Sequence, residues 1–365
     1  MQLPRKRRLV PLVALCGALA FGAAACGGDD DSGSGDGGGG LSGTLAGAGA
    51  SSQAAAMEAW VAGFQEANTG ATVTYEPIGS GGGREQFVAG GTDFGGSDAH
   101  LADDELTGAQ DRCGGPDNLI EIPVYVSPIA IVYNLPGVTD LKLSPETLAK
   151  IFKREITNWN DPAIAADNAG VDLPDTRIVT VNRSDESGTT ENFAEYLAAV
   201  APDVWTYDVD GNWPVSGGEA GQGTAGVIDA VNAGEGTIGY ADASQAGDLG
   251  KALIGVGGEF VGPTPEAAAA IVDESPETDD PGKYVFTFAL DRKTEASGVY
   301  PIVLASYEMA CTQYDSADKA ALVKGWMQYL VSPEGQQAAA SAAGSAPLSD
   351  ELTALVKPAV DAIGS

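Results

Sequence analysis

Apolar residues recur along the chain with two periods. Short runs rich in β-branched residues, typical of strands, alternate with segments in which apolar residues return every three or four positions, typical of helices. The segment 53–67 shows the helical pattern, and one side of it carries Met57, Trp60, Val61 and Phe64. This alternation predicts an α/β fold.

Two apolar runs are long enough to connect separate parts of the chain. The first, Leu119–Asn134, is broken by Pro123 and Pro128 and is too polar for a membrane helix, so we expect a strand that passes from one domain to the next. The second, 300–310, is expected to be the return crossing. The remaining pattern predicts strands at 41–50, 72–78, 177–181 and 236–241, and helices starting near 84, 144, 191, 225, 317, 333 and 350.

Three of the strands lead into turns of glycine and hydroxyl residues that open a helix. These turns place Ser51 and Ser52, then Ser80, and later Ser187 and Thr189, where backbone N–H groups have no partner within the helix. The positive end of the helix dipole and the hydroxyls suit a tetrahedral oxyanion. A single turn of this kind is more often an ordinary helix cap. Three of them in one chain favour a common role.

Two charged residues stand beside these turns. Arg183 precedes the helix start at Ser187, and its planar guanidinium can donate two parallel hydrogen bonds to an anion. Gly188 would let the backbone approach such a ligand closely. Asp98 lies in the loop after a short buried strand that includes Phe94. An isolated aspartate there is usually a turn former, so Asp98 becomes informative only together with the other turns.

The composition limits the possible ligands. The 365 residues are enough for two domains, and 44% are hydrophobic, as in a protein with a packed core. With 19 basic and 51 acidic residues the net charge is −32, so the surface repels nucleic acid and anionic lipid. An anion receptor with this charge must attract its ligand through a few aimed dipoles. The single histidine, His100, argues against histidine-based zinc sites and against an enzyme, so we expect no metal and no cofactor.

The N-terminal segment has the pattern of an export signal. Basic residues at 5–8 precede the apolar segment 9–25, which is typical of a secretory signal peptide. Small residues stand before Cys26, as in a bacterial lipobox, although Ala23 occupies the usual leucine position. We expect a signal peptide at 1–25 and a flexible Gly/Ser/Asp tether at 26–40 that begins with a lipid on Cys26. Simple cleavage and release is the alternative.

Two further cysteines, Cys113 and Cys311, remain in the exported chain. Each lies next to one of the two long apolar runs, on what would be the same domain. In an exported protein two remaining cysteines favour one disulfide, and two buried free thiols are the alternative.

Four motifs taken together resemble those of the periplasmic phosphate-binding proteins of ABC transporters. They are Gly47-Ala48-Gly49-Ala50-Ser51, Ile78-Gly79-Ser80-Gly81-Gly82, Asp93-Phe94-Gly95-Gly96-Ser97-Asp98 and Arg183-Ser184-Asp185-Glu186-Ser187-Gly188-Thr189. The resemblance implies a two-domain periplasmic-binding-protein fold of type II, with the ligand in the interdomain cleft and two crossing hinge strands. It implies domain I at 41–129 plus 301–365 and domain II at 130–300.

By motif position, the resemblance also implies a set of phosphate contacts and a residue that braces one of them. The contacts are Ser51, Ser52, Ser80, Asp98, Arg183, Ser187, Gly188 and Thr189, and Asp185 would brace Arg183. The family usually has Thr-Phe at Ser51-Ser52, so Ser52 is expected to supply its backbone N–H. An ionised Asp98 can only accept hydrogen bonds, so it would attract the proton of phosphate and repel fully ionised sulfate.

The function implied by the resemblance is that of a monomeric receptor held by its lipid on the outer face of the cell membrane. It would close on inorganic phosphate at Pro128 and Tyr300-Pro301 and deliver it to ABC transporter permease subunits, without a nucleic-acid partner. Three alternatives stay open. They are a receptor for sulfate or molybdate, a secreted phosphatase with Ser187 as nucleophile, and a phosphate sensor or adhesion lipoprotein without a transporter.

Overall fold

The structure is a computed structural model that describes residues 40–101, 103–273, 275–276, 278 and 282–365. The predicted signal peptide, the lipid site Cys26 and the tether up to residue 39 lie outside the described residues. Within the described part of the chain, no helix combines the length and the apolar character that a membrane span requires.

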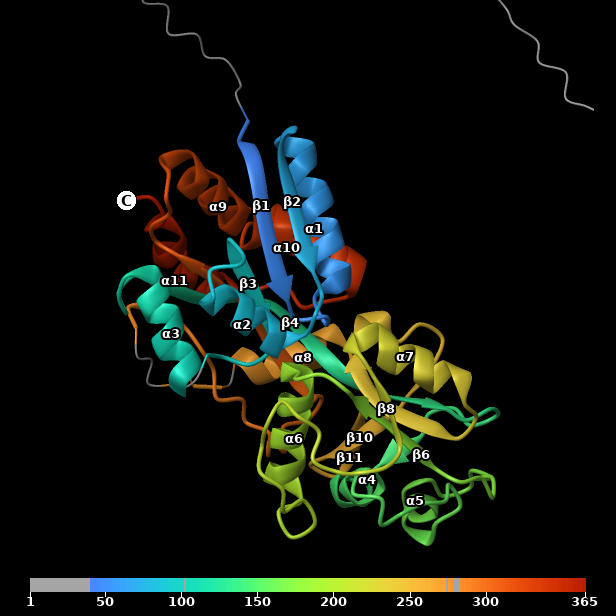
Figure 1. Cartoon of the computed structure of the whole chain (residues 1–365). Coiled ribbons are helices and arrows are strands. Elements are labelled where there is room, and N and C mark those ends of the chain that lie inside the picture. Colours follow the sequence, from blue (N-terminus) through green and yellow to red (C-terminus); the bar gives the residue numbers. More distant parts are fainter. Residues whose placement is uncertain (1–39, 102, 274, 277, 279–281) are drawn as a thin grey trace, which may run out of the picture. The chain divides into compact units, whose positions relative to one another are not determined.

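A mixed sheet connects most of the strands in the order β2-β1-β3-β13-β4-β8-β6-β7 (Figure 1). These are β1 (Ser42–Gly49), β2 (Gly70–Glu76), β3 (Phe94–Ser97), β4 (Leu119–Asn134), β6 (Val179–Arg183), β7 (Glu219–Gly221), β8 (Thr237–Asp242) and β13 (Val303–Cys311), with β9 (Gly250–Lys251) and β12 (Tyr284–Val285) beside β4. A smaller sheet joins β5 (Lys142–Leu143), β10 (Leu253–Val256) and β11 (Glu259–Val261). The predicted α/β class is confirmed.

Helices pack against these strands and against one another. They are α1 (Ala54–Ala67), α2 (Ser80–Val88), α3 (Asp103–Cys113), α4 (Pro145–Phe152), α5 (Pro162–Asp167), α6 (Gly188–Val200), α7 (Gly223–Ala233), α8 (Pro265–Asp273), α9 (Ala317–Leu330), α10 (Pro333–Ala343) and α11 (Asp350–Asp361), with the short 3₁₀ helix η1 (Ala243–Gln245). α1 packs against α10 and β2, and α7 packs against β6, β7 and β8. The apolar side predicted for α1 is buried at Met57, Trp60 and Phe64.

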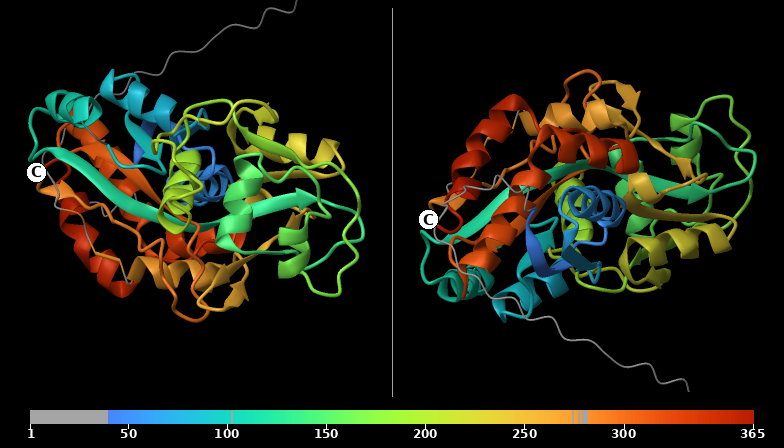
Figure 2. Two further views of the ribbon diagram at one scale, coloured as in Figure 1. Left: turned by 90° about the horizontal axis from the view of Figure 1, so that it is seen from below. Right: turned by 90° about the horizontal axis from the view of Figure 1, so that it is seen from above.

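β4 is the strand that the two parts of the sheet share, and it has the bounds predicted from its apolar run. Its first part pairs with β13, up to Pro128 opposite Val303. From Ile129 onward it pairs with β8, beginning opposite Asp242. β4 is thus one continuous strand that changes neighbour between Pro128 and Ile129 (Figures 1 and 2). The division into domains at 129/130 and 300/301 stays a prediction.

α2 begins at Ser80, four residues before the helix start expected at residue 84. Consecutive glycines weaken a helix, which is why the sequence pattern placed the start after them. A Cβ atom on Gly83 would lie 2.4 Å from the Cα atom of Gly49 at the end of β1. The helix therefore approaches β1 at backbone contact, and glycine is the residue that allows this approach.

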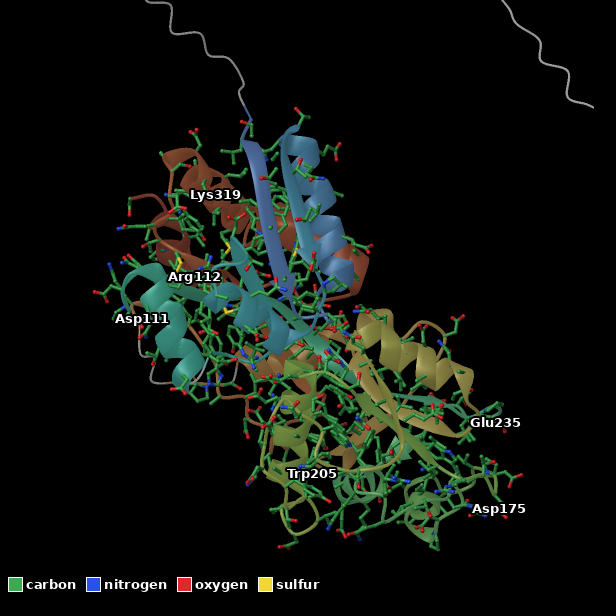
Figure 3. All side chains as sticks on the ribbon, viewed as in Figure 1. Asp111, Arg112, Asp175, Trp205, Glu235 and Lys319 are labelled. Carbon is green, nitrogen blue, oxygen red and sulfur yellow. A yellow bond between two sulfur atoms is a disulfide. The ribbon has the colours of Figure 1, made fainter. Side chains whose placement is uncertain are left out.

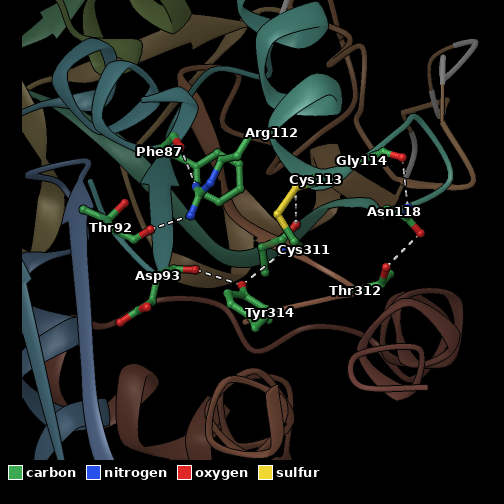
Figure 4. The surroundings of a disulfide bond; sticks show 11 residues. Phe87, Thr92, Asp93, Arg112, Cys113, Gly114, Asn118, Cys311, Thr312 and Tyr314 are labelled. Atoms are coloured by element: carbon green, nitrogen blue, oxygen red, sulfur yellow. Dashed lines mark hydrogen bonds between the residues drawn. A yellow bond between two sulfur atoms is a disulfide. The ribbon is translucent and has the colours of Figure 1, made fainter. Parts of the chain in front are cut away.

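A disulfide joins Cys113 at the end of α3 to Cys311 at the end of β13 (Figure 4). Next to it, the guanidinium carbon of Arg112 lies 3.9 Å from the centre of the Phe87 ring. The same guanidinium donates to the backbone oxygens of Phe87 and Thr92, so α3 is tied to the end of α2 and to the loop before β3 (Figures 3 and 4). The predicted disulfide is confirmed.

Replacing both Cys113 and Cys311 by serine should lower the free energy of unfolding by about 2–4 kcal/mol, because the unfolded chain regains the freedom that a cross-link of distant residues removes. The two cysteines are 198 residues apart in sequence. Urea unfolding of the two proteins measures the difference. A reductant should lower the stability of the parent protein and leave that of the double variant unchanged. Equal stability of the two proteins under oxidising conditions would contradict the disulfide.

Candidate functional site

The first group of predicted residues lies at the carboxyl ends of parallel strands. β1 pairs in parallel with β2 and with β3. Ser51 and Ser52 follow β1, Ser80 opens α2 after β2, and Asp98 follows β3 directly. Since the carboxyl ends of parallel strands share one edge, these loops come together where open α/β sheets bind their ligands.

The second group lies at the junction of β6 and α6. β6 ends at Arg183, two residues beyond the strand expected at 177–181, so Arg183 is a strand residue and not part of the following loop. β6 is also parallel to its neighbours β7 and β8. Ser187 is the N-cap of α6, and its Oγ accepts from the Thr190 N–H over 3.3 Å. The hydroxyl of Ser187 therefore serves its own helix, as an ordinary helix cap does.

The carboxylate of Asp98 is the point where the two groups meet. Ser52 Oγ donates to Asp98 Oδ1 over 2.6 Å, and Thr189 Oγ1 donates to Oδ2 over 2.8 Å. The Asp98 N–H donates to Ser80 Oγ over 3.1 Å. Asp98 is only 3% exposed, so the hydroxyls of Ser52 and Thr189 satisfy a buried carboxyl group. Ser52 contributes its hydroxyl here, whereas the sequence predicted only its backbone N–H.

α6 contacts the Asp98 loop at backbone distance. A Cβ atom on Gly188 would lie 2.6 Å from the Ala99 nitrogen and 2.8 Å from Asp98 Cβ. One turn later, the Asn192 side-chain amide donates to the Asp98 backbone oxygen over 2.7 Å. The absence of a side chain at Gly188 thus lets the start of α6 come close enough for Thr189 to contact the carboxylate.

Arg183 is buried and paired with Asp185. Its Nε donates to Asp185 Oδ1 over 2.9 Å, and a terminal nitrogen lies 2.5 Å from Oδ2. Burial acts to raise the pKa of Asp185, but the hydrogen bond and charge of Arg183 and the Gly223 N–H outweigh it and lower the pKa below its usual value. Asp185 is therefore ionised, and it fixes the plane of the guanidinium.

Glycine and serine of the second turn link Asp98 to this ion pair. Ser80 accepts from Asp98, as described above, and its neighbour Gly79 lies against the pair. A Cβ atom on Gly79 would be 2.5 Å from Asp185 Oδ2 and 3.4 Å from an Arg183 terminal nitrogen. Gly79 has a φ of 100°, which L side chains rarely adopt, so glycine is required here for two reasons.

The start of α7 links the ion pair to the first turn. The Gly223 N–H donates to Asp185 Oδ1 over 2.9 Å. The next residue, Thr224, donates its N–H to Ser51 Oγ over 3.0 Å, and the two hydroxyl oxygens are 3.2 Å apart. Ser51 precedes Ser52, so the contacts close into a ring. In order, the ring contains Asp98, Ser80, Gly79, Asp185 with Arg183, Gly223, Thr224, Ser51 and Ser52.

Three polar residues of this region were missed by the sequence pattern. They are Thr224, Ser306, whose Oγ donates to Asp98 Oδ1 over 2.7 Å, and Arg84, which contacts Glu186 Oε1 at 2.7 Å in the loop before α6. A serine inside the apolar run at 300–310 was a usable signal for Ser306. Arg84 directly follows the glycine-rich turn at 79–83, which was a usable signal, whereas Thr224 stands in an ordinary helix pattern.

A cavity of about 250 Å³ touches Asp98 outside the ring. Its lining includes His100, Glu191 and Arg292 but not Arg183. Burial raises the pKa of Glu191 to about 7, and the guanidinium of Arg292 is paired with Glu195 at 3.0 Å. Within the described residues, no group of three or more His, Cys, Asp or Glu side chains is placed to hold a metal ion.

Comparison with known proteins identifies relatives over nearly the whole chain. Residues 34–334 match the family model of the PBP superfamily domain. The phosphate-binding protein PstS 3 of Mycobacterium tuberculosis strain H37Rv is 37% identical over 366 residues, covering 96% of this chain and 98% of that protein. PstS 3 of Mycobacterium leprae is 35% identical over 370 residues, with the same coverage.

Solved structures show the same fold. A high-affinity periplasmic phosphate-binding protein, PfluDING, bound with phosphate at pH 8.5, superposes with a TM-score of 0.72 at 24% identity, over 86% of this chain and 93% of that one. A phosphate-binding protein from Stenotrophomonas maltophilia superposes with a TM-score of 0.68 at 20% identity, over 87% and 93%. At these identities the superpositions establish the fold, which is that of the two-domain periplasmic binding proteins.

Proposed function

Because the chain belongs to the PBP superfamily and, within it, to the PstS phosphate-binding proteins, we propose that it binds inorganic phosphate and delivers it to the permease of an ABC transporter. The observation that carries the proposal is the closed ring of contacts around Asp98 and Arg183. Phosphate contacts are assigned to the residues of the four motifs, namely Ser51, Ser52, Ser80, Asp98, Arg183, Ser187, Gly188 and Thr189.

The chemistry of the ring suits a small, strongly hydrated anion. A desolvated phosphate needs many donors, and each hydrogen bond to a charged group contributes roughly 1.5–3 kcal/mol. The hydroxyls of Ser51, Ser52 and Thr189 and the guanidinium of Arg183 are such donors. The helices α1, α2 and α7 begin at the ring and α6 begins beside it, and each N-terminus adds about 0.3–2 kcal/mol. Neutral donors aimed at the ligand then supply most of the affinity, because the net charge of −32 gives the protein an overall field that repels an anion.

Release of the ligand requires the ring to open, and we assign the hinge to the strand crossing. Three side-chain contacts join segments about a hundred residues apart or more, between Asp98 and Thr189, Ser51 and Thr224, and Arg84 and Glu186. All three would separate if the chain rotated where β4 changes neighbour, at Pro128, and at Tyr300-Pro301 on the return path. The closed and open forms would present different surfaces to permease subunits.

The remaining parts of the proposal concern the setting. A lipid on Cys26, after removal of the signal peptide 1–25, would hold the protein on the outer face of the cell membrane as a monomer. The relatives are binding proteins, and the proposed receptor has no catalytic step. A serine nucleophile needs a base, and among the described residues no hydrogen bond joins Ser187 to His100, which is exposed; this speaks against the phosphatase alternative. Incubation with p-nitrophenyl phosphate should therefore release no nitrophenol.

Asp98→Asn should weaken phosphate binding by about tenfold and strengthen sulfate binding, because an amide can donate to an anion that an ionised carboxylate repels. The substitution fits this position because the side chain of Asp98 is contacted by hydroxyls, which can also accept a hydrogen bond from the new amide. Calorimetric titrations with phosphate and with sulfate measure the two affinities.

The matched control is Asp111→Asn, which makes the same charge change at an exposed position on α3 (Figure 3). Both affinities should stay those of the parent protein in this variant. If Asp98→Asn leaves the ratio of the two affinities unchanged, Asp98 has no role in the choice between phosphate and sulfate. The argument from Asp98 against a sulfate receptor then fails.

A further inference from the structure

A chain of buried polar side chains continues from Asp98 away from the ring. Ser306 Oγ donates to Asp98 Oδ1 over 2.7 Å, and Gln53 Nε2 donates to Ser306 Oγ over 2.6 Å. Ser306 and Gln53 are completely buried. Ser306 comes from β13 and Gln53 from the residue just before α1, so the chain joins two elements that the ring does not connect.

Glu308, on the same strand as Ser306, lies at the end of this chain. It stands opposite Gly96 in the pairing of β13 with β3. A Cβ atom on Gly96 would be 2.9 Å from Gln53 Oε1 and 3.1 Å from Glu308 Oε1, so the two oxygens converge on the same small space. Within the described residues, Gln53 Oε1 and both Glu308 oxygens have no hydrogen-bond partner.

Burial disfavours the charged form of Glu308. Its side chain is completely buried, and the described residues place no cation against it. Burial raises the pKa of Glu308 well above its usual value, against a smaller lowering by the side chain of Gln53. A neutral carboxyl has one O–H to donate. The Tyr75 hydroxyl also faces Gly96, but it donates its proton to the Ala50 backbone oxygen over 3.1 Å and is therefore not a donor to Gln53.

The direction of the whole chain follows from counting protons. An ionised Asp98 can only accept, so Ser306 must give its single proton to Asp98. Ser306 Oγ can then only accept from Gln53, so Gln53 must turn its NH₂ group toward Ser306. Its Oε1 then points toward Glu308. On that side, a neutral Glu308 would supply the donor that Gln53 Oε1 lacks. The reverse orientation of Gln53 would turn the Ser306 proton toward Oε1 and leave Asp98 with one donor fewer.

We propose that Glu308 and Gln53 are positioning residues for Asp98: they fix the direction of the chain Glu308–Gln53–Ser306–Asp98, so that Ser306 donates permanently to the carboxylate. Ser52 and Thr189, which also donate to Asp98, remain free to turn to the ligand. Ser306 has no such freedom, because Gln53 occupies its lone pair and its other acceptor, the Ser97 backbone oxygen, is farther away at 3.3 Å. The Asp98 carboxylate is thereby held in place as an acceptor for the proton of the ligand. The inference rests on the proposed phosphate binding at Asp98.

Three variants test the proposal by calorimetric titration with inorganic phosphate. Glu308→Met removes the terminal donor at similar volume and should weaken phosphate binding by about tenfold, the loss expected for one hydrogen bond to a charged group. Glu308→Gln keeps an N–H donor for Gln53 Oε1 and should retain the parent affinity. Ser306→Ala removes the link itself and should weaken binding at least as much as Glu308→Met.

The double variant Ser306→Ala, Glu308→Met should bind phosphate no more weakly than Ser306→Ala alone, because Glu308 acts only through Ser306. Thermal unfolding without phosphate separates positioning from a structural role. Glu308→Met loses the donor to Gln53 but also removes a buried carboxyl, and these effects on stability oppose each other, so its unfolding temperature should stay close to that of the parent protein while affinity falls.

The proposal is overturned if Glu308→Met binds like the parent protein, if Glu308→Gln loses as much affinity as Glu308→Met, or if the two losses add in the double variant. Ser306→Ala keeps the test decisive should Glu308→Met fail to fold, since unchanged affinity in Ser306→Ala also overturns it. A parent protein that gives no heat with phosphate would instead refute the proposed function, so the two failures are distinguishable.

Discussion

Arg183→Met is expected to weaken phosphate binding by about 100-fold or more, since it removes hydrogen bonds from the only cation in the ring. The substitution also orphans Asp185, which the guanidinium of Arg183 and the Gly223 N–H now stabilise. An unpaired carboxylate beside the ligand would repel it. Removing one partner of a buried ion pair costs about 3–5 kcal/mol of stability, so thermal unfolding should show a loss even without phosphate.

Two further variants separate these causes. Arg183→Lys keeps the positive charge but cannot form the two-bond fork with Asp185, so its affinity should lie between those of the parent protein and of Arg183→Met. In the double variant Arg183→Met, Asp185→Asn, the repulsive charge is gone and part of the stability and affinity should return. An affinity of Arg183→Met within a few-fold of the parent value would exclude Arg183 from the binding site.

Gly188→Val should abolish measurable phosphate binding while the protein stays folded. A single Cβ atom at this position would already lie 2.6 Å from the Ala99 nitrogen, which is backbone and cannot move aside alone. Overpacking of this kind typically costs 1–3 kcal/mol for added methylenes, and here it falls on the contact that brings Thr189 to Asp98. The start of α6 and the Asp98 loop must then separate, so Thr189 loses its contact with Asp98 and the two groups of site residues no longer meet there.

The matched control is Gly91→Val, at an exposed glycine whose Cβ atom would meet only ordinary contacts, the nearest at 3.4 Å. It should bind phosphate like the parent protein. Thermal unfolding with and without phosphate gives the readout, because a ligand that binds only the folded state raises the unfolding temperature. If phosphate stabilises Gly188→Val as much as the parent protein, the close approach of α6 is not needed for binding.

The parts of the fold that could be predicted from sequence are those set by local pattern. β4 has its predicted bounds, because a long apolar run bounded by polar residues is decisive for a buried strand. α10 begins at Pro333, where a helix start was expected, because Ser332 caps the helix and proline takes its first position. In these cases local preference and tertiary packing agree.

The predicted start of α2 and the predicted end of β6 were wrong, because at both places tertiary contacts override the local sequence preference. Glycines inside α2 argue against a helix, yet Gly83 is needed for backbone contact with Gly49. β6 continues to Arg183 because its last residues pair with β7, whose position no local pattern predicts. Such contacts depend on segments that are distant in sequence, so periodicity cannot show them.

The candidate site was predictable only in part for the same reason. The family resemblance identified Asp98 and Arg183 by their positions in the motifs. The hydroxyl residues at helix starts predicted a site for a tetrahedral oxyanion. Thr224 contacts Ser51 across 173 residues of chain, and Ser306 reaches Asp98 across 208. Both stand outside the four motifs, so only the assembled fold brings them to the ring.

The central claim is that one ring, built from turns far apart in sequence, encloses a single phosphate ion. Calorimetric titration of the phosphate-free protein with inorganic phosphate, repeated with sulfate, tests it most directly. The account predicts one phosphate bound per chain and far weaker binding of sulfate. The absence of heat with phosphate, a stoichiometry of two, or equal affinity for sulfate would contradict it.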